Sequence, residues 1–155
     1  MLSAMNADDA IRLRRVISKL ARELNSSSTG AGLTPSQASV LGLISGHEPV
    51  SLSELGELEG LNPTMLSRVI SKLHTLGMID RIPDPADLRS ASVVSTTAGK
   101  RVSREVKARR AAAVSRGLEK VAPEQADLLT RALPALEAFA ETMREVGLSD
   151  RHVSY

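Results

Sequence analysis

Five polar or basic side chains recur at helical spacing in the stretch LNPTMLSRVISKLHTLGMIDR, residues 61–81. They are Thr64, Ser67, Arg68, Ser71 and Lys72. Serine and threonine hydroxyls can donate or accept hydrogen bonds, and an arginine can bind the edge of a guanine through two of them. A serine or lysine one turn further along a helix suits a phosphate group instead. The spacing therefore indicates a face that contacts DNA, although small polar residues also occur on any solvated helix.

The same stretch carries the signals that begin and end a helix. Asn62 followed by Pro63 is typical of a helix start, and Gly77 is typical of a helix end. Between them the apolar side chains gather on the side opposite the polar ones: Leu66, Val69, Ile70, Leu73 and Leu76. Residues 63–76 are therefore predicted to form an amphipathic helix with one face on a core.

Two further helices are predicted before this one, each from its N-terminal cap. Thr34 with Pro35 begins a helix over about 34–45, and Ser51 begins another over 52–59. Only residues 60–62, which include a glycine, separate the second of these from the helix at 63–76. Two helices joined by such a turn form a helix-turn-helix, whose second helix fits the major groove of DNA.

A β-hairpin is predicted directly after the helix-turn-helix. Its strands are marked by Met78, Ile79 and Ile82 and by Ala91, Val93 and Val94. The tip is DPADLRS, residues 84–90, where Arg89 could enter the narrow minor groove and Asp87 could brace Arg89 or hold the tip. A hairpin in this position makes a winged helix. The predicted fold class is mainly α with a small β-hairpin wing: a winged helix-turn-helix plus terminal dimerisation helices.

The outer segments are also predicted to be helical. Residues 8–24 carry one apolar stripe at helical spacing. Thr96 or Thr97 can cap a second helix that runs to about residue 121. Pro123 opens a last helix, in which Pro134 predicts a kink or a local break. The terminal stripes need a partner surface. We expect dimerisation through Leu13, Val16, Ile17, Leu20, Leu129, Leu133, Leu136 and Met143. The alternative is that these helices pack on their own monomer.

The expected organisation follows from these elements. Residues 1–32 and 122–155 hold the dimerisation helices, residues 33–98 form the winged helix-turn-helix DNA-binding domain, and residues 99–121 form a long linking helix.

Charge is distributed unevenly along the chain of 155 residues. Residues 62–110 hold ten Lys or Arg and four Asp or Glu, a balance of +6, which leaves −4 for the rest of a chain of net charge +2. A basic block in an otherwise acidic chain suggests a polyanion partner. The sequence contains no cysteine, no signal peptide and no apolar run long enough to span a membrane, so we expect a cytoplasmic protein.

The order of these motifs resembles the MarR family of bacterial transcription regulators. The similarity rests on Ser67–Ile70, on the D-P-x-D-x-R-S tip at 84–90 and on the T-x-x-G of residues 96–99, and it covers about residues 33–99. This chain has Ser95 where the family usually has leucine before the threonine. It also has Leu88 where the family often has a basic residue.

The resemblance implies a homodimer that binds double-stranded DNA and probes an inverted repeat with half-sites about 10 bp apart. It also implies a repressor that responds to a small apolar or aromatic effector. Many relatives bind aromatic effectors between the DNA-binding lobe and the dimer helices. Phe139 and Tyr155 are the only aromatic residues here, so ring stacking in such a pocket is largely unavailable.

Other classes of function have less support. The three histidines, His47, His74 and His152, show no metal-binding spacing, and there is no phosphate-binding glycine loop or nucleophile elbow. We therefore expect no catalytic residues, no metal and no cofactor. The principal alternative is a winged-helix protein-interaction module without sequence-specific DNA binding, and a small enzyme is a third reading.

Overall fold

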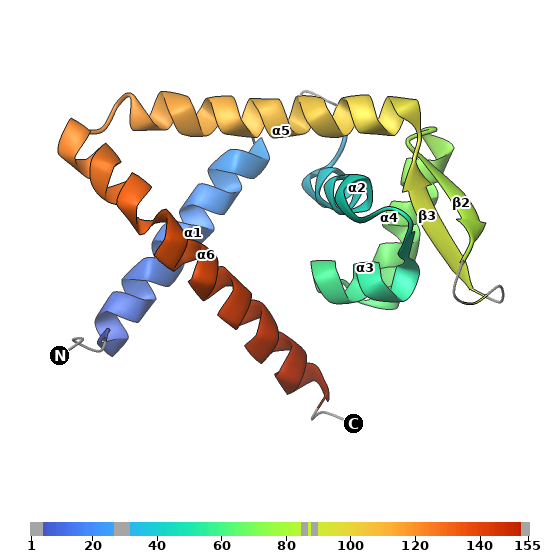
Figure 1. Cartoon of the computed structure of the whole chain (residues 1–155), viewed down its shortest axis with the longest axis horizontal. Coiled ribbons are helices and arrows are strands. Elements are labelled where there is room, and N and C mark those ends of the chain that lie inside the picture. The colour runs from blue at the N-terminus through green and yellow to red at the C-terminus, as the bar shows by residue number, and fades with distance from the viewer. Residues whose placement is uncertain (1–4, 27–31, 85–86, 88–89, 153–155) are drawn as a thin grey trace. The chain divides into compact units, whose positions relative to one another are not determined.

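The computed structural model describes residues 5–26, 32–84, 87 and 90–152, with side chains as far as residue 146. Six helices and three strands follow in the order α1 (Ala7–Ser26), α2 (Pro35–His47), β1 (Val50–Ser51), α3 (Leu52–Glu59), α4 (Pro63–Thr75), β2 (Ile79–Pro83), β3 (Ala91–Ser95), α5 (Thr97–Leu118) and α6 (Pro123–His152). The chain forms two compact units, Met1–Val114 and Ser115–Tyr155. In the first unit, α2, α3 and α4 gather with the sheet around the first half of α5 (Figure 1). The predicted fold class, mainly α with a small β-hairpin wing, is confirmed, and the dimerisation role of the terminal helices stays a prediction.

The helices of the helix-turn-helix begin at the caps that the sequence predicts. Thr34 Oγ1 accepts from the backbone N–H of Gln37 at 3.3 Å, and the Gln37 side chain accepts from the Thr34 N–H at 3.0 Å. Ser51 and Asn62 cap α3 and α4 in the same way, accepting from the N–H three residues ahead at 3.2 and 2.9 Å. These bonds satisfy donors that have no partner inside a helix, so they fix where each helix begins.

Glycines in the left-handed conformation set both ends of the turn-and-helix segment. Gly60, with φ of 68°, ends α3 and starts the turn into α4. Gly77, also at φ 68°, follows α4, and its N–H donates to the His74 carbonyl while the Met78 N–H donates to that of Leu73. This pair of bonds is a Schellman ending, which turns the chain directly from α4 into β2.

The wing belongs to a three-stranded antiparallel sheet with the order β1-β3-β2. The predicted hairpin is confirmed: Ile79 pairs with Ser95 and Pro83 with Ala91. Strand β1, which pairs Val50 with Val93, was not predicted. It has two residues, and its second residue is also the cap of α3, so no alternating pattern can announce it.

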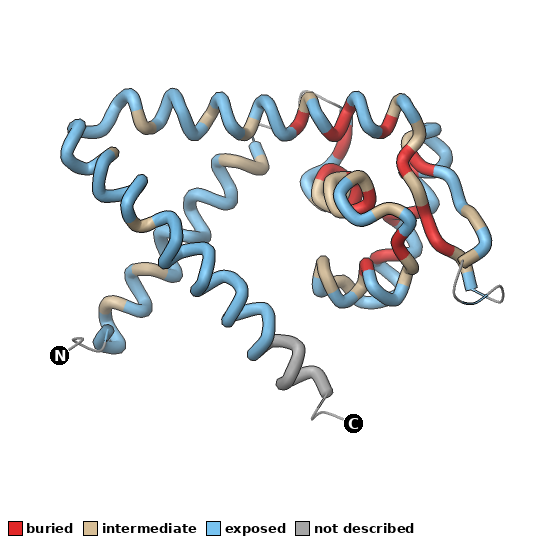
Figure 2. The backbone as a smooth tube through the Cα atoms, viewed as in Figure 1, coloured by how far each residue is buried: buried red, intermediate tan, exposed pale blue. Residues whose placement is uncertain are grey.

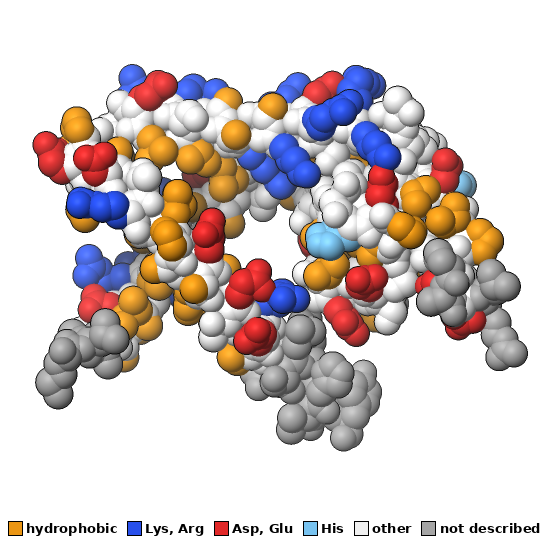
Figure 3. Space-filling view, viewed as in Figure 1, with side chains coloured by type: hydrophobic (Ala, Val, Ile, Leu, Met, Phe, Trp, Pro, Cys, Tyr) orange, Lys and Arg blue, Asp and Glu red, His pale blue; other side chains and the backbone are white. Residues whose placement is uncertain are grey.

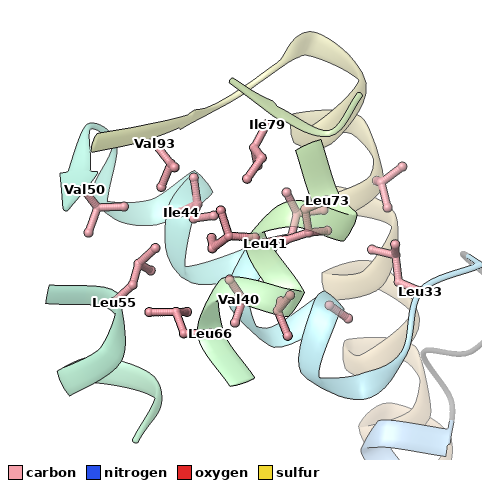
Figure 4. Packing of buried hydrophobic residues seen from close by; sticks show 14 of the residues in the cluster. Leu33, Val40, Leu41, Ile44, Val50, Leu55, Leu66, Leu73, Ile79 and Val93 are labelled. Carbon is pink, nitrogen blue, oxygen red and sulfur yellow. The ribbon is translucent and has the colours of Figure 1, made fainter. Parts of the chain in front are cut away.

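One aliphatic core holds the first unit together. Buried residues lie in α2, α3, α4, the sheet and the first half of α5 (Figure 2), and their side chains meet between these elements (Figure 4). Leu41, Ile44, Ile70, Leu73 and Ile79 are completely buried at its centre. Burial of its apolar side chains in this core therefore fixes the orientation of α4, so that its polar side faces solvent.

Of the kink or local break predicted at Pro134, the break does not occur, because α6 continues without interruption from Pro123 to His152. A proline removes one backbone donor from a helix. The helical bonds on both sides of that single gap keep the segment continuous.

The start of α5 is locked against the end of α4. Thr96 Oγ1 accepts from the Gly99 N–H at 3.0 Å and donates to the Gly77 carbonyl at 2.7 Å, and the Thr96 N–H donates to the Met78 carbonyl at 3.0 Å. Thr96 is thus the cap of α5. A Cβ on Gly99 would lie 1.9 Å from the Met78 oxygen. The T-x-x-G motif is the signature of this close approach.

We predict that Gly99→Ala destabilises the protein by about 2–3 kcal/mol, because the added methyl group must displace backbone rather than a flexible side chain. Gly117→Ala, in the same helix with nothing within 4 Å of its added Cβ, should leave stability unchanged or raise it by up to about 1 kcal/mol. Urea unfolding of the two variants measures both effects. Equal stability of Gly99→Ala and the parent would show that the contact is not a constraint.

Candidate nucleic-acid interface

Helix α4 presents all five predicted polar contacts on one exposed face. Thr64, Ser67, Arg68, Ser71 and Lys72 are each exposed. The core side chains Leu66 and Leu73 point from the opposite side of the helix (Figure 4). The structure therefore brings the five candidates together as the sequence predicts, on a helix whose orientation is set by its buried side.

Two of these candidates carry a positive charge that forms no ion pair within the described part of the chain. Within the described part of the chain, no salt bridge or side-chain hydrogen bond involves Arg68 or Lys72. Further along α4, the Thr75 hydroxyl donates to the Ser71 carbonyl at 2.9 Å, which occupies Thr75 but leaves the Ser71 hydroxyl outward. A guanidinium and an ammonium held outward in this way can each bind a base edge or a phosphate.

Ser90 closes the tip of the wing. Its N–H donates to the Asp87 carbonyl at 3.0 Å, and its hydroxyl lies 3.2 Å from Asp84 Oδ2 and 3.1 Å from the same Asp87 carbonyl. Asp87 thus helps to close the tip through its backbone carbonyl, which accepts both of these bonds from Ser90. Arg89, the predicted minor-groove residue, lies outside the described residues. Ser90 was not singled out in the sequence, although it is the last residue of the D-P-x-D-x-R-S motif.

The basic residues of α5 differ from those of α4 because several have partners. Lys100 pairs with Glu48, Arg101 lies 3.1 Å from Glu105, and Arg110 donates to the Asn25 side chain at 3.3 Å. Lys and Arg side chains gather along α5 (Figure 3). The basic block counted in the sequence therefore combines internally paired cations on α5 with unpaired cations on α4.

Known proteins share this arrangement. The MarR family model matches residues 33–91. An HTH-type transcriptional regulator of Mycobacterium bovis, named as uncharacterized, is 27% identical over 124 residues, which are 76% of this chain and 87% of that protein. The crystal structure of RV1404 from Mycobacterium tuberculosis is 27% identical, with a TM-score of 0.70 over 89% of this chain and 97% of that one.

A MarR family transcriptional regulator from a Rhodococcus species is 25% identical, with a TM-score of 0.67 over 86% of this chain and 96% of that one. Residues 33–91 of the chain form a MarR family domain. Apo MarR of E. coli, 21% identical over 82% of this chain and 95% of that one, shares the fold at a TM-score of 0.73. Members of this family are transcription regulators rather than enzymes, so the domain at 33–91 is that of a transcription regulator.

In the part of the chain that the structure describes, no group of three or more His, Cys, Asp or Glu side chains is placed to hold a metal ion. None of the described helices is long and apolar enough to cross a membrane.

A polar brace lies behind the wing, around the residue that departs from the usual family pattern. The buried Ser95 shares a hydrogen bond of 2.8 Å with the Ser45 hydroxyl, and its N–H donates to Glu48 Oε2 at 2.7 Å. Glu48 also pairs with Lys100, in the first turn of α5. Ser95 thus has a hydroxyl where the family usually has an apolar leucine side chain, and Ser45 provides the hydrogen-bond partner that this buried hydroxyl needs. Sequence spacing could not reveal this brace because its members are about fifty residues apart.

The hydrogen bond from the Lys100 ammonium holds the pKa of Glu48 below its ordinary value of 4.5. Burial opposes this lowering in part, and the Ser95 N–H, a smaller effect than burial, lowers the pKa again. Glu48 is therefore a carboxylate at neutral pH. It links the end of α2, the end of β3 and the start of α5.

A pocket of about 270 Å³ opens between α2, α3 and α5. Its apolar lining includes Leu43, Leu58 and Val106. Its polar lining includes Lys107 and Glu59, and the Glu59 carboxylate accepts from the Ser39 hydroxyl at 2.9 Å. No aromatic residue lines the pocket, as the composition of the chain predicts.

We predict that Glu48→Gln destabilises the protein by about 1 kcal/mol at pH 7, because it removes the ion pair with Lys100 but can keep an acceptor for Ser95. The folded pKa of Glu48 is lowered, so its stabilising effect is complete above 4.5 and disappears as pH falls through the folded value. The difference between parent and variant should therefore shrink toward pH 3. Thermal unfolding at pH 7, 5 and 3 measures it.

Glu105→Gln is the matched control, since Glu105 pairs with Arg101 on the exposed side of α5. That change should cost less than about 0.5 kcal/mol at every pH. A Glu48→Gln deficit that persists unchanged at pH 3 would contradict the electrostatic explanation.

Proposed function

We propose that this protein binds double-stranded DNA as a homodimer and represses transcription by occupying promoter DNA. The observation that carries the proposal is the exposed face of α4, where Arg68 and Lys72 form no salt bridge with any of the described residues although the helix itself is capped and packed on the core. An unpaired cationic face on a rigid helix creates a local positive potential that attracts negative charge. DNA supplies that charge, and α4 has the size to enter the major groove.

The contacts divide by position along α4. Thr64, Ser67 and Arg68 lie in its first half and would meet base edges, whereas Ser71 and Lys72 lie further along and would meet phosphates. Arg89 would enter the minor groove from the wing tip, and Asp87 would support that tip. As a regulator of bacterial type, the protein would act in the cytoplasm.

Exposed apolar side chains on the terminal helices support a homodimer. Seven of the eight predicted dimerisation residues are exposed, including Leu20 at 57% and Leu133 at 51%, and the eighth, Leu13, is half-buried. Leaving such stripes in water is unfavourable, and a second copy of the chain would cover them. A two-fold dimer would place its two α4 helices on half-sites about 10 bp apart.

The pocket between α2, α3 and α5 is the candidate effector site. A similar solved structure, that of the Mycobacterium tuberculosis MarR family protein RV2887, 24% identical to this chain, is a complex with p-aminosalicylic acid. Here the apolar lining with Lys107 at its edge suits a small apolar molecule that carries an anionic group. A ligand there would separate α3, and with it the turn into α4, from α5.

We predict that the protein binds the DNA upstream of its own gene more tightly than scrambled DNA, with two chains per duplex and with affinity that falls steeply as salt rises. Arg68→Ala should lower affinity by about tenfold or more, since a bidentate contact is worth about 1–3 kcal/mol. Lys72→Ala should weaken all sequences alike and reduce the salt slope by about one. Fluorescence anisotropy and sedimentation velocity measure these quantities.

Arg104→Ala is the matched control, because it removes the same charge from the exposed side of α5. It should change affinity by less than about twofold if only nearby charges matter. Weak binding that is equal on both DNAs, and unchanged by Arg68→Ala, would instead favour a winged-helix protein-interaction module.

We predict that small apolar anions release the protein from DNA and that Gly42→Leu abolishes this response, because the new side chain fills the pocket that Gly42 lines. A Cβ at Gly42 meets nothing within 4 Å, so the fold should accept the change. Gly46→Leu, in the same helix and also unobstructed but outside the pocket lining, is the control. Release from DNA by the same ligand in Gly42→Leu would place the effector elsewhere.

A further inference from the structure

One apolar side chain on the DNA-facing part of α4 has no place in the core. Met65 lies in the first turn of the helix and is 43% exposed, whereas its neighbour Leu66 is only 4% exposed. The remaining aliphatic residues of α4, Val69, Ile70 and Leu73, are all buried. Met65 is thus the exception on a helix that otherwise separates apolar and polar residues cleanly.

The backbone fixes where this side chain begins. The Met65 N–H donates to the Asn62 side chain at 2.9 Å, the bond that caps α4. Helical spacing then places Met65 one turn before Arg68 and two turns before Lys72, along the flank of the polar face. Met65 therefore lies beside the residues that are proposed to meet DNA, at the end of the helix that enters deepest into a major groove.

The major groove offers one apolar group that such a side chain can recognise. Thymine carries a methyl group at C5 there, and apolar side chains distinguish thymine by contact with that methyl. The thioether of methionine is flexible and polarizable, so it can follow a small apolar surface closely. Cytosine, adenine and guanine carry no methyl group on the same edge.

We propose that Met65 selects a thymine in each half-site by contact with its 5-methyl group. The inference rests on the proposed function, since it needs α4 in the major groove, but it assigns base selection to a residue outside the polar set. Side chains three apart on a helix are about 5–6 Å apart, and stacked bases are about 3.4 Å apart. The selected thymine should therefore lie within about two base pairs of the base that Arg68 reads.

The test uses a duplex selected by the full-length protein from a random DNA library. Each thymine is replaced in turn, in both half-sites, by deoxyuridine, which lacks only the methyl group. One position should lower the affinity of the parent protein by about fourfold per half-site, the effect of one buried methyl-sized group. Met65→Ala should bind the thymine duplex more weakly by a similar factor and should not distinguish thymine from uracil at that position.

Leu76→Ala is the matched control, because Leu76 is 38% exposed but lies just past the C-terminal end of α4. It should keep the full preference for thymine. Met65→Gln, with a side chain of similar length and a polar end, should lose that preference as Met65→Ala does, and thermal unfolding should show both Met65 variants folded.

The outcomes separate the two proposals. Binding that needs Arg68 but is indifferent to uracil at every position, or a Met65→Ala variant that keeps the full thymine preference, overturns the assignment of Met65 and leaves the proposed function standing. Failure of the parent protein to select any sequence from the library overturns both.

Discussion

The close approach of α5 to the Met78 carbonyl is the constraint on which the winged helix-turn-helix depends. That oxygen accepts from the Thr96 N–H, and Gly99 packs so near to it that no side chain fits between. One residue before Met78, at Gly77, the Schellman bonds end α4. One small region therefore joins the end of α4, the start of β2, the end of β3 and the start of α5. The recognition helix and the wing cannot be reoriented independently while this junction holds.

The distribution of charge is consistent with that rigidity. On the scaffold, two charge pairs involve α5: Glu48 pairs with the Lys100 ammonium and accepts from the Ser95 N–H, and Arg101 pairs with Glu105. On α4, Arg68 and Lys72 project from a helix that is already fixed by its cap and its buried side. A partner that neutralises them would not need to order the helix first, so less of the binding free energy is lost to ordering. This is an arrangement suited to a preformed reading surface.

The features that could be predicted from the sequence are those that depend only on residues within four positions of each other. Caps at Thr34, Ser51 and Asn62, the glycine at the end of α4 and the exposed side of α4 all follow from local spacing, and the structure confirms them. Strand β1 and the Ser45–Ser95–Glu48 brace could not be predicted, because they depend on the meeting of segments about fifty residues apart. Pro134 illustrates the converse: a strong local signal for a break is outweighed by the helix on both sides.

The terminal helices present a different energetic problem from the winged helix-turn-helix. α1 contains no buried residue, and none of the described side chains of α6, residues 123–146, is buried either. Helices gain most of their stability in proteins from packing an apolar face, so these two have little to hold them in a single copy of the chain. If a second copy covers them, as we propose, folding of the terminal helices and assembly of the dimer are one process. The spacing of the two α4 helices would then be set by the same contacts that keep α1 and α6 folded. Because α5 runs as one helix from the Thr96 cap to Leu118, it would transmit that spacing directly to the junction at Met78.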